Sequence, residues 1–360
     1  MRKSPEILIV GQGIAGTVLH HTLLERGIFA KIINTDLPGR SSAAAAGIIN
    51  PITGPKYHKS WNFDELMQVF LPFYSKLQQK LNVSFFLKMR MFRYLPGLNQ
   101  INKWIRRWDD PADAAYYGEF FTNMEGYPEI RDEGRWAEIY NAFRVDLNAL
   151  IITYREFLEL NKLTENELFQ FDQLKIHHQF TTYKNQQYDH IIFCEGYMIK
   201  DNPYFSYLPV IPAKGEALLV KRKNPGDVMS KRNELITQWN SENVWYGATM
   251  QNNFESIFAS PESRQLLIEK YMDDFEEEPM ITAQLAGLRP TVSDRKPLIG
   301  QHPVHPTLYV MNGLGTKGAS LAPLMAKNLT DLILDNLNLP EEVDIKRFKL
   351  KSPDKFTVPH

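Results

Sequence analysis

Six residues near the start of the chain, Gly11-Gln12-Gly13-Ile14-Ala15-Gly16, have the glycine spacing of a dinucleotide-binding turn. A short apolar run, residues 7–10, comes directly before them, and a helical pattern of apolar residues follows. In such a unit the first glycine permits a tight turn, the second lets the backbone approach a diphosphate, and the third lets the helix pack closely on the strand. The helix N-terminus then offers N–H groups to the diphosphate. We therefore predict that Gly11, Gly13, Ile14, Ala15 and Gly16 bind a dinucleotide cofactor.

The position that would bind the adenosine ribose departs from the usual pattern. An acidic side chain commonly ends the second strand of such a unit, but here the position holds Asn34, and Asp36 follows two residues later. Either side chain can hydrogen-bond a hydroxyl group, and both stay candidates. Arg40 adds another alternative, because an arginine just past this strand can select the 2′-phosphate of NADP.

Small and hydroxyl-bearing residues fill the next segment, 39–47. One interpretation is a helix start capped by Ser41 or Ser42. The interpretation we favour is a segment that lies against a large flat ligand, where bulky side chains would not fit. Ser41, Ser42, Ala46 and Gly47 would then line the cofactor site.

Late in the chain, the stretch AGLRPTVSDRKPLIG (residues 286–300) places four charged side chains between glycines and prolines. The guanidinium of Arg289 is suited to a carboxylate, because its planar fork donates two parallel hydrogen bonds. From the residues alone, a structural role, either an ion pair with Asp294 or a place in a surface loop, is an equally good interpretation.

Composition limits the class of protein. A chain of 360 residues is long enough for two domains, and its net charge of -1 gives no overall attraction to nucleic acid or anionic lipid. No apolar run is long enough to span a membrane. Cys194 is the only cysteine, which excludes an internal disulfide and a multi-cysteine metal site; we predict no metal site and a cytoplasmic location.

Two further segments carry predictions. Residues 63–81 are expected to be a helix, and residues 88–108 interleave basic and aromatic side chains. Such interleaving can bind single-stranded nucleic acid, but an amphipathic strand and helix is the interpretation we favour. Residues 188–196 read as a buried strand ending in glycine, where the backbone of Cys194 and Gly196 would approach the cofactor.

Taken in order, these motifs resemble the D-amino acid oxidase family of flavoproteins, which includes glycine oxidase, sarcosine oxidase and D-amino acid dehydrogenase. The resemblance rests on residues 11–16, 41–47, 189–196, 214–216, 247–250, 287–290 with 294–300, and 312–323. It implies an α/β fold: a Rossmann-type FAD-binding domain assembled from separate segments, and an α+β substrate domain with an antiparallel sheet. We expect residues 1–58, 143–208 and 283–345 in the first, 59–142 and 209–282 in the second, and 346–360 as a C-terminal tail.

The same resemblance assigns the remaining site residues. It makes Arg289 the carboxylate anchor, placed against the cofactor, and Met250 a wall of the substrate pocket. Tyr246 stands four residues before Met250 on the expected strand, so alternation would put both on one face and make Tyr246 a pocket wall or hydroxyl donor. A tyrosine of the core is an equally good interpretation. Gly313, Gly315, Thr316, Lys317 and Gly318 are expected to form a helix start that binds the flavin edge, with the Lys317 charge close to it.

The implied activity is oxidation of the C–N bond of a small amino acid or secondary amine by hydride transfer to the N5 atom of non-covalently bound FAD. Oxygen or another acceptor would then reoxidise the flavin. Two alternatives are the same chemistry on a tRNA wobble uridine, in which residues 88–108 contact RNA, and a non-catalytic flavoprotein. A nucleic-acid partner is the less favoured expectation.

Overall fold

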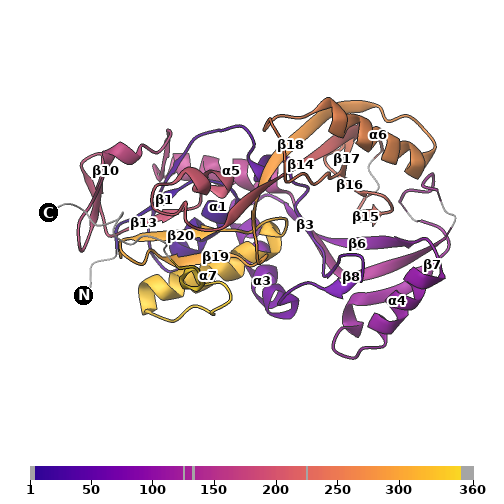
Figure 1. Cartoon of the computed structure of the whole chain (residues 1–360), viewed down its shortest axis with the longest axis horizontal. Coiled ribbons are helices and arrows are strands. Elements are labelled where there is room, and N and C mark those ends of the chain that lie inside the picture. Colours follow the sequence, from indigo (N-terminus) through magenta and orange to yellow (C-terminus); the bar gives the residue numbers. More distant parts are fainter. Residues whose placement is uncertain (1–4, 125, 132–133, 224–225, 350–360) are drawn as a thin grey trace.

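A computed structural model describes residues 5–124, 126–131, 134–223 and 226–349 of the chain. Two sheets lie side by side along the long axis of the molecule (Figure 1). The first has six strands in the order β19-β20-β13-β1-β2-β9. Their bounds are Leu298–Gln301, Leu308–Asn312, His190–Phe193, Ile7–Val10, Lys31–Asn34 and Thr164–Asn166.

This first sheet is parallel except at one edge. β1 pairs in parallel with β2 and β13, β13 with β20, and β2 with β9, whereas β19 and β20 are antiparallel. β1 is buried along its whole length, as expected for an apolar strand covered on both faces. The strand–turn–helix unit predicted from the glycine motif is therefore present.

Helices cover this sheet. α1 (Ile14–Glu25) packs against α7 (Gly318–Asp335), and α7 in turn packs against α3 (Phe63–Leu81), where the Tyr74 hydroxyl donates to the Ala319 carbonyl oxygen at 2.7 Å. The helix predicted at residues 63–81 is confirmed. α5 (Leu147–Leu160) begins at Asp146, whose side chain accepts a hydrogen bond from the Ala149 N–H and so caps the helix.

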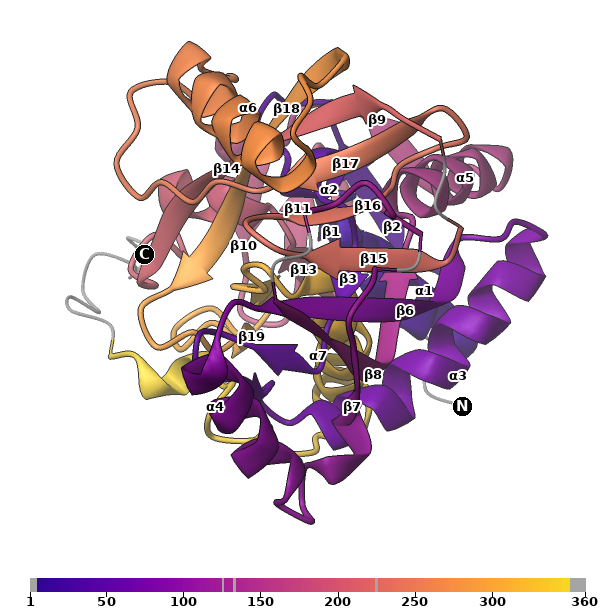
Figure 2. The same ribbon diagram turned by 90° about the vertical axis from the view of Figure 1, so that its right-hand side faces the viewer.

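The second sheet has nine strands and is mostly antiparallel. Its order is β18-β14-β17-β16-β15-β6-β8-β3, with β7 also paired to β8. The bounds are Ile281–Val292, Val210–Lys221, Asn243–Gly247, Leu235–Gln238, Val228–Lys231, Phe86–Leu95, Arg135–Val145, Ile48–Ile49 and Tyr117–Phe121. α6 (Pro261–Phe275) packs on β14 and β17. α4 (Leu98–Trp108) lies near β7, at the end of the molecule that faces the viewer in Figure 2. The predicted α/β class, with a parallel cofactor-type sheet and an antiparallel-rich second sheet, is confirmed.

Smaller elements complete the described chain. They are α2 (Ser41–Ala44), the hairpin of β4 (Ile52–Thr53) and β5 (His58–Lys59), and a three-stranded sheet of β10 (Leu174–Ile176), β11 (Thr181–Tyr183) and β12 (Gln186–Tyr188). Short 3-10 helices occupy Ala114–Tyr116, Phe171–Gln173, Gly196–Asp201 and Ile345–Arg347. Within the described ranges, no helix combines the length and the apolar character that crossing a bilayer requires.

Strand pairing bears on the expected domain boundaries. β3 and β18 belong to the nine-stranded sheet, whereas the predicted division put residues 48–49 and 283–292 with the cofactor-binding segments. The boundaries stay a prediction, and residues 350–360 of the predicted tail lie outside the described residues.

The basic and aromatic stretch at residues 88–108 forms β6 and α4, the strand and helix that we favoured. Three of its four aromatic side chains, Phe92, Tyr94 and Trp104, are buried in the protein interior, and Trp108 is partly exposed. The three buried rings are therefore not free to stack on nucleic-acid bases, which is how aromatic side chains bind single strands.

Candidate functional site

A cavity of about 750 Å³ lies between the two sheets. Most of the predicted site residues line it: Gly11, Gly13, Ile14, Ala15, Asn34, Asp36, Ser41, Ser42, Ala46, Gly47, Cys194, Gly196, Arg289, Gly315, Thr316 and Gly318. Five do not: Gly16, Gly313, Lys317, Tyr246 and Met250. The roles of all these residues stay predictions, and their positions are described below.

The glycine turn leaves no room for side chains. A Cβ atom on Gly11 would lie 2.7 Å from the Cys194 carbonyl oxygen, and one on Gly16 would lie 1.9 Å from the Gly11 carbonyl oxygen. Gly11 also has a φ of +100°, which side-chain-bearing residues rarely adopt. Gly16 thus serves the packing of α1 on the turn, while Gly11 and Gly13 face the cavity.

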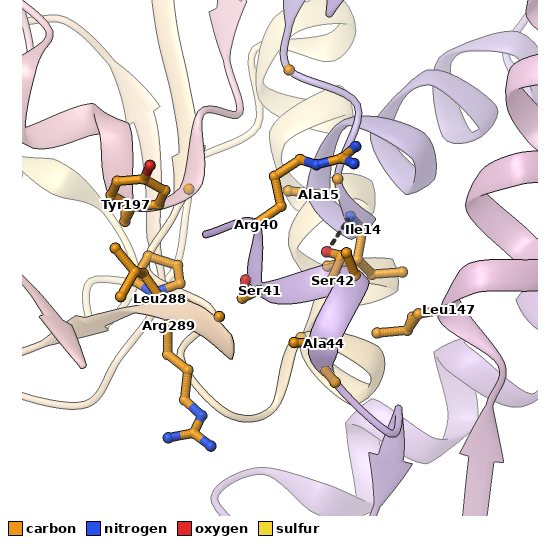
Figure 3. Close-up of a pocket in the computed structure, with 18 of the residues that line it drawn as sticks. Ile14, Ala15, Arg40, Ser41, Ser42, Ala44, Leu147, Tyr197, Leu288 and Arg289 are labelled. Carbon is orange, nitrogen blue, oxygen red and sulfur yellow. Dashed lines mark hydrogen bonds between the residues drawn. The ribbon is translucent and has the colours of Figure 1, made fainter. Parts of the chain in front are cut away.

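The N-terminus of α1 points free donors at this cavity. The Ile14 N–H donates to the Ser42 hydroxyl at 3.2 Å (Figure 3), whereas no hydrogen bond within the described parts of the chain uses the N–H groups of Gly13 and Ala15. Unpaired N–H groups at a helix N-terminus bind anions well. The turn therefore fits the diphosphate of a dinucleotide.

At the expected ribose end, both candidate side chains line the cavity, and each already has a partner. Asn34 accepts a hydrogen bond from the Gln12 N–H at 2.9 Å. Asp36 accepts from Arg155 at 3.0 Å and pairs with Arg40, and the hydrogen bond from Arg155 holds the pKa of this carboxyl below its usual value. Arg155, on α5, was not predicted because only the fold brings it to Asp36.

The small-residue segment 39–47 joins the two sheets. The Leu288 N–H donates to the Gly39 carbonyl oxygen at 2.8 Å, and the Trp245 indole donates to the Ala44 carbonyl oxygen at 3.0 Å. A Cβ atom on Gly287 would lie 3.0 Å from the Ser41 Cα. Small residues are therefore required here by the packing against β18 as well as by the cavity. The alternative interpretation, a helix start capped by Ser41 or Ser42, is wrong because neither serine caps α2.

The end of β13 brings the backbone of Cys194 and Gly196 to the cavity, as predicted. Burial raises the pKa of the Cys194 thiol, which keeps it protonated. Next to it, Glu195 was missed by the sequence interpretation: it faces the same cavity and accepts a hydrogen bond from Asn202 at 2.7 Å. Burial raises the pKa of Glu195 to about 7.

Arg289 extends from β18 into the cavity wall, away from Arg40 and the Ile14–Ser42 hydrogen bond (Figure 3). Among the described residues its one recorded hydrogen bond goes from Nη1 to the Thr249 carbonyl oxygen, at 3.0 Å. Asp294, the alternative partner, pairs with Arg347 instead, at 2.8 Å. Burial lowers the pKa of Arg289, but a guanidinium is so strong a base that it stays charged. The site therefore holds a cation with N–H donors available for a ligand.

Tyr246 and Met250 do not share a face, contrary to expectation. β17 ends at Gly247, so its alternation does not extend to Met250, which is 59% exposed. Tyr246 is fully buried on the side of the sheet covered by α6, where its hydroxyl donates to Asp274 at 2.7 Å. The residues of this sheet that do reach the cavity, and that were missed, include Lys231, Leu235 and Trp245.

The turn before α7 departs in part from the prediction. The Gly313 N–H is used by the Asn312 side chain at 2.7 Å, and the Gly315 N–H by the Pro290 carbonyl oxygen at 3.2 Å. Lys317 donates to the Ser60 hydroxyl at 3.3 Å, and burial lowers its pKa. Thr316 and Gly318 remain at the cavity wall beside the start of α7.

Comparison with known proteins supports a single family. The sequence profile of the DAO family, described as FAD dependent oxidoreductase, matches residues 6–332. Among solved structures, iminodiacetate oxidase from Chelativorans sp. BNC1 is 19% identical, with 95% of this chain and 98% of that chain covered and a TM-score of 0.76. Glycine oxidase from Bacillus cereus ATCC 14579 is 20% identical, with 93% and 96% covered and a TM-score of 0.76.

A third structure, glycine oxidase from Geobacillus kaustophilus, is 18% identical, with coverage of 96% and 98% and a TM-score of 0.76. At these identities the structures establish the fold, while the profile covers most of the chain. The glycine cradle and the unpaired N–H groups of α1 fit the diphosphate of the cofactor that the profile names. The chain therefore belongs to the DAO family of FAD-dependent oxidoreductases and is an enzyme whose cofactor is FAD.

Proposed function

We propose that this enzyme oxidises the C–N bond of a small amino acid or secondary amine that carries a carboxylate. The observation that carries the proposal is the guanidinium of Arg289, which stands in the cavity wall and makes a single recorded hydrogen bond to the described part of the chain. A guanidinium binds a carboxylate through two parallel hydrogen bonds, so Arg289 would hold the substrate by that group.

The backbone beneath Arg289 fixes where the carboxylate would lie. A Cβ atom on Gly215 would lie 2.1 Å from Nη2 of Arg289, so the guanidinium rests directly on the β14 backbone. Thr249 holds it from one side. A guanidinium fixed in this way orients the substrate before reaction, and such positioning supplies much of the catalysis when no acid or base is required.

The residues around the cavity also favour the neutral amine. Ala217, Leu235 and Trp245 form an apolar part of the wall, and a protonated amine loses solvation there. Bound FAD supplies a hydride acceptor for the substrate carbon. Molecular oxygen or another acceptor then takes the electrons.

Anaerobic reduction tests the proposal. Purified protein carrying FAD is mixed with glycine, sarcosine and a series of D-amino acids, and bleaching of the flavin absorbance is followed. We expect at least one of these to bleach the flavin, and Arg289→Met to lower kcat/KM for it about 30- to 1000-fold, as removal of a desolvated charge contact typically costs roughly 2–4 kcal/mol.

Lys296→Gln is the matched control. Lys296 belongs to the same charged stretch but pairs with Glu342 at 2.8 Å, away from the cavity lining, so its kcat/KM should stay within about twofold of the wild-type value. An Arg289→Met variant that keeps its flavin and its full kcat/KM would refute the proposed role.

A further inference from the structure

A second positive region lies on the same sheet face as Arg289, further across the nine-stranded sheet. Lys231 is the last residue of β15 and lines the cavity. Strands β14, β17 and β16 separate β15 from β18, the strand that carries Arg289. The cavity therefore extends across the sheet from one cation to the other.

The register of the sheet shows which side chains share this face. Leu235 pairs with Lys231 on one side and with Gly247 on the other, and Gly247 pairs with Ala217. All four line the cavity. Arg93 of β6 is the partner of Lys231 across the remaining edge, and directly paired residues project to the same side of a sheet. The Arg93 side chain therefore rises beside Lys231.

Neither cation has an ion-pair partner among the residues that the structure describes. No hydrogen bond or ion pair of Lys231 is recorded among the residues that the structure describes, and Nε of Arg93 is buried without a hydrogen-bond partner there. The carboxylate that acts on Lys231, Glu234, already binds Lys270. Burial, and then the charge of Arg93, lower the pKa of Lys231.

This arrangement is unfavourable unless it serves a ligand. Other cations of the same region are paired: Arg232 binds Asp274 at 3.0 Å, and Arg90 binds Glu138 at 3.0 Å. Lys231 stands at the cavity wall and Arg93 lies beside it. Two like charges held side by side in the protein lose solvation and repel each other. An anion in the cavity would offset both effects.

We propose that Lys231, with Arg93 beside it, forms a subsite for a second acidic group of the substrate. The substrate is then an amino acid or secondary amine with two carboxylates, one held by Arg289 and the other by Lys231. This rests on the proposed function, since it takes Arg289 as the anchor of the first carboxylate.

Pairs of substrates that differ only in the second charge test this subsite. D-glutamate is compared with D-glutamine, and iminodiacetate with its monoamide, by the ratio of kcat/KM for acid over amide. We expect a ratio of at least ten in the wild-type enzyme, because a hydrogen bond between two charged groups is about ten- to a hundredfold stronger than its neutral counterpart in binding. Lys231→Gln should reduce the ratio about tenfold.

Lys221→Gln is the control, because Lys221 ends β14 at an exposed position outside the cavity lining; it should keep the wild-type ratio. Arg93→Gln, which removes the neighbouring charge, should lower the ratio by a smaller factor. Flavin content confirms that each variant has folded. A wild-type ratio near one, or a ratio that Lys231→Gln leaves unchanged, would overturn the subsite.

A binding measurement separates failure of the subsite from failure of the proposed function. If no amine reduces the flavin, the proposed function fails, but glutarate and glutaramate still report on the cavity by calorimetry with the FAD-loaded protein. Binding of glutarate about tenfold tighter than glutaramate, lost in Lys231→Gln, would support the subsite. Equal affinities, or no binding of either at millimolar concentration, would reject it.

Discussion

The two sheets contribute to the cavity in different ways. The six-stranded sheet contributes mainly backbone, at the Gly11 turn, the N-terminus of α1 and the end of β13 at Cys194, together with the side chain of Asn34 at the end of β2. The nine-stranded sheet contributes side chains from one face, among them Arg289 and Lys231. A cofactor bound by backbone depends on chain geometry at a few glycines, whereas a substrate bound by side chains depends on the strand register that gathers them.

The largest expected effect comes from adding a methyl group to the cofactor turn. Gly11→Ala would place a Cβ atom 2.7 Å from the Cys194 carbonyl oxygen at a φ of +100°. We expect this variant to retain less than a tenth of the wild-type flavin, measured by the ratio of absorbance at 450 and 280 nm. Backbone must move to relieve the contact, at a cost of several kcal/mol.

Gly27→Ala is the matched control for that experiment. Gly27 also has a positive φ, +76°, but no atom lies within 4 Å of its added Cβ. The substitution should cost about 1 kcal/mol through backbone strain alone and leave flavin content unchanged. Equal flavin loss in both variants would mean that backbone strain explains the flavin loss of Gly11→Ala. The contact of the added Cβ with the Cys194 carbonyl oxygen at the end of β13 would then not be its cause.

In the nine-stranded sheet, the substitution Gly215→Ala should leave the fold and the flavin content unchanged. A Cβ atom on Gly215 would lie 2.1 Å from Nη2 of Arg289. The guanidinium is the free end of a long side chain and can move aside, so Gly215→Ala should keep its FAD. We expect kcat/KM to fall about ten- to a hundredfold, because a displacement of about 1 Å disturbs the alignment of the substrate.

Stopped-flow reduction by an amine that bleaches the wild-type flavin measures this loss. Gly97→Ala, whose added Cβ would approach only Gln100 at 3.8 Å, should behave as wild type. Flavin loss in Gly215→Ala would contradict the proposal that the six-stranded sheet binds the cofactor and the nine-stranded sheet binds the substrate.

The same contrast explains which predictions from sequence succeeded. The glycine turn, the buried β1 strand and the helix at residues 63–81 follow from local spacing and periodicity, and the structure contains all three. Tyr246 was assigned by extending strand alternation to Met250, and this was wrong because β17 ends at Gly247. Lys231 and Arg155 were missed because the residues that lie beside them, Arg93 and Asp36, come from distant segments of the chain, which no local pattern reports.

A buried histidine on α1, the helix that covers the six-stranded sheet, should make the stability of the protein fall at acidic pH. His21 packs edge-on against Phe73 and Tyr154, and burial lowers its pKa from 6.5 to about 4. Because the folded-state pKa lies below the unfolded value, the unfolded chain binds the proton first. Stability from this group is therefore complete above pH 6.5 and is lost as the pH falls toward 4.

His21→Phe removes the titrating group and keeps an aromatic ring in place. We expect the thermal unfolding temperature of the variant to match the wild type at pH 7.5 and to exceed it by a few degrees at pH 5, corresponding to about 1–2 kcal/mol. The strands of the nine-stranded sheet contain no histidine within the described residues. The loss of stability at low pH that His21 causes is therefore expected in the part of the molecule around the six-stranded sheet. A variant that loses stability in parallel with wild type between pH 7.5 and 5 would contradict it.

The smallest effect is expected from substitution of Cys194. This residue tests whether FAD binding on the six-stranded sheet depends on the backbone or on a side chain. Its carbonyl oxygen packs against Gly11, but its thiol is buried with a raised pKa and so lacks the thiolate that a covalent bond to flavin would require. Cys194→Ala should therefore keep the wild-type flavin content, and acid precipitation should release all the flavin from both proteins. Flavin that stays with the precipitated wild-type protein, or a variant that no longer binds FAD, would show that the cofactor side depends on this side chain and not on backbone alone.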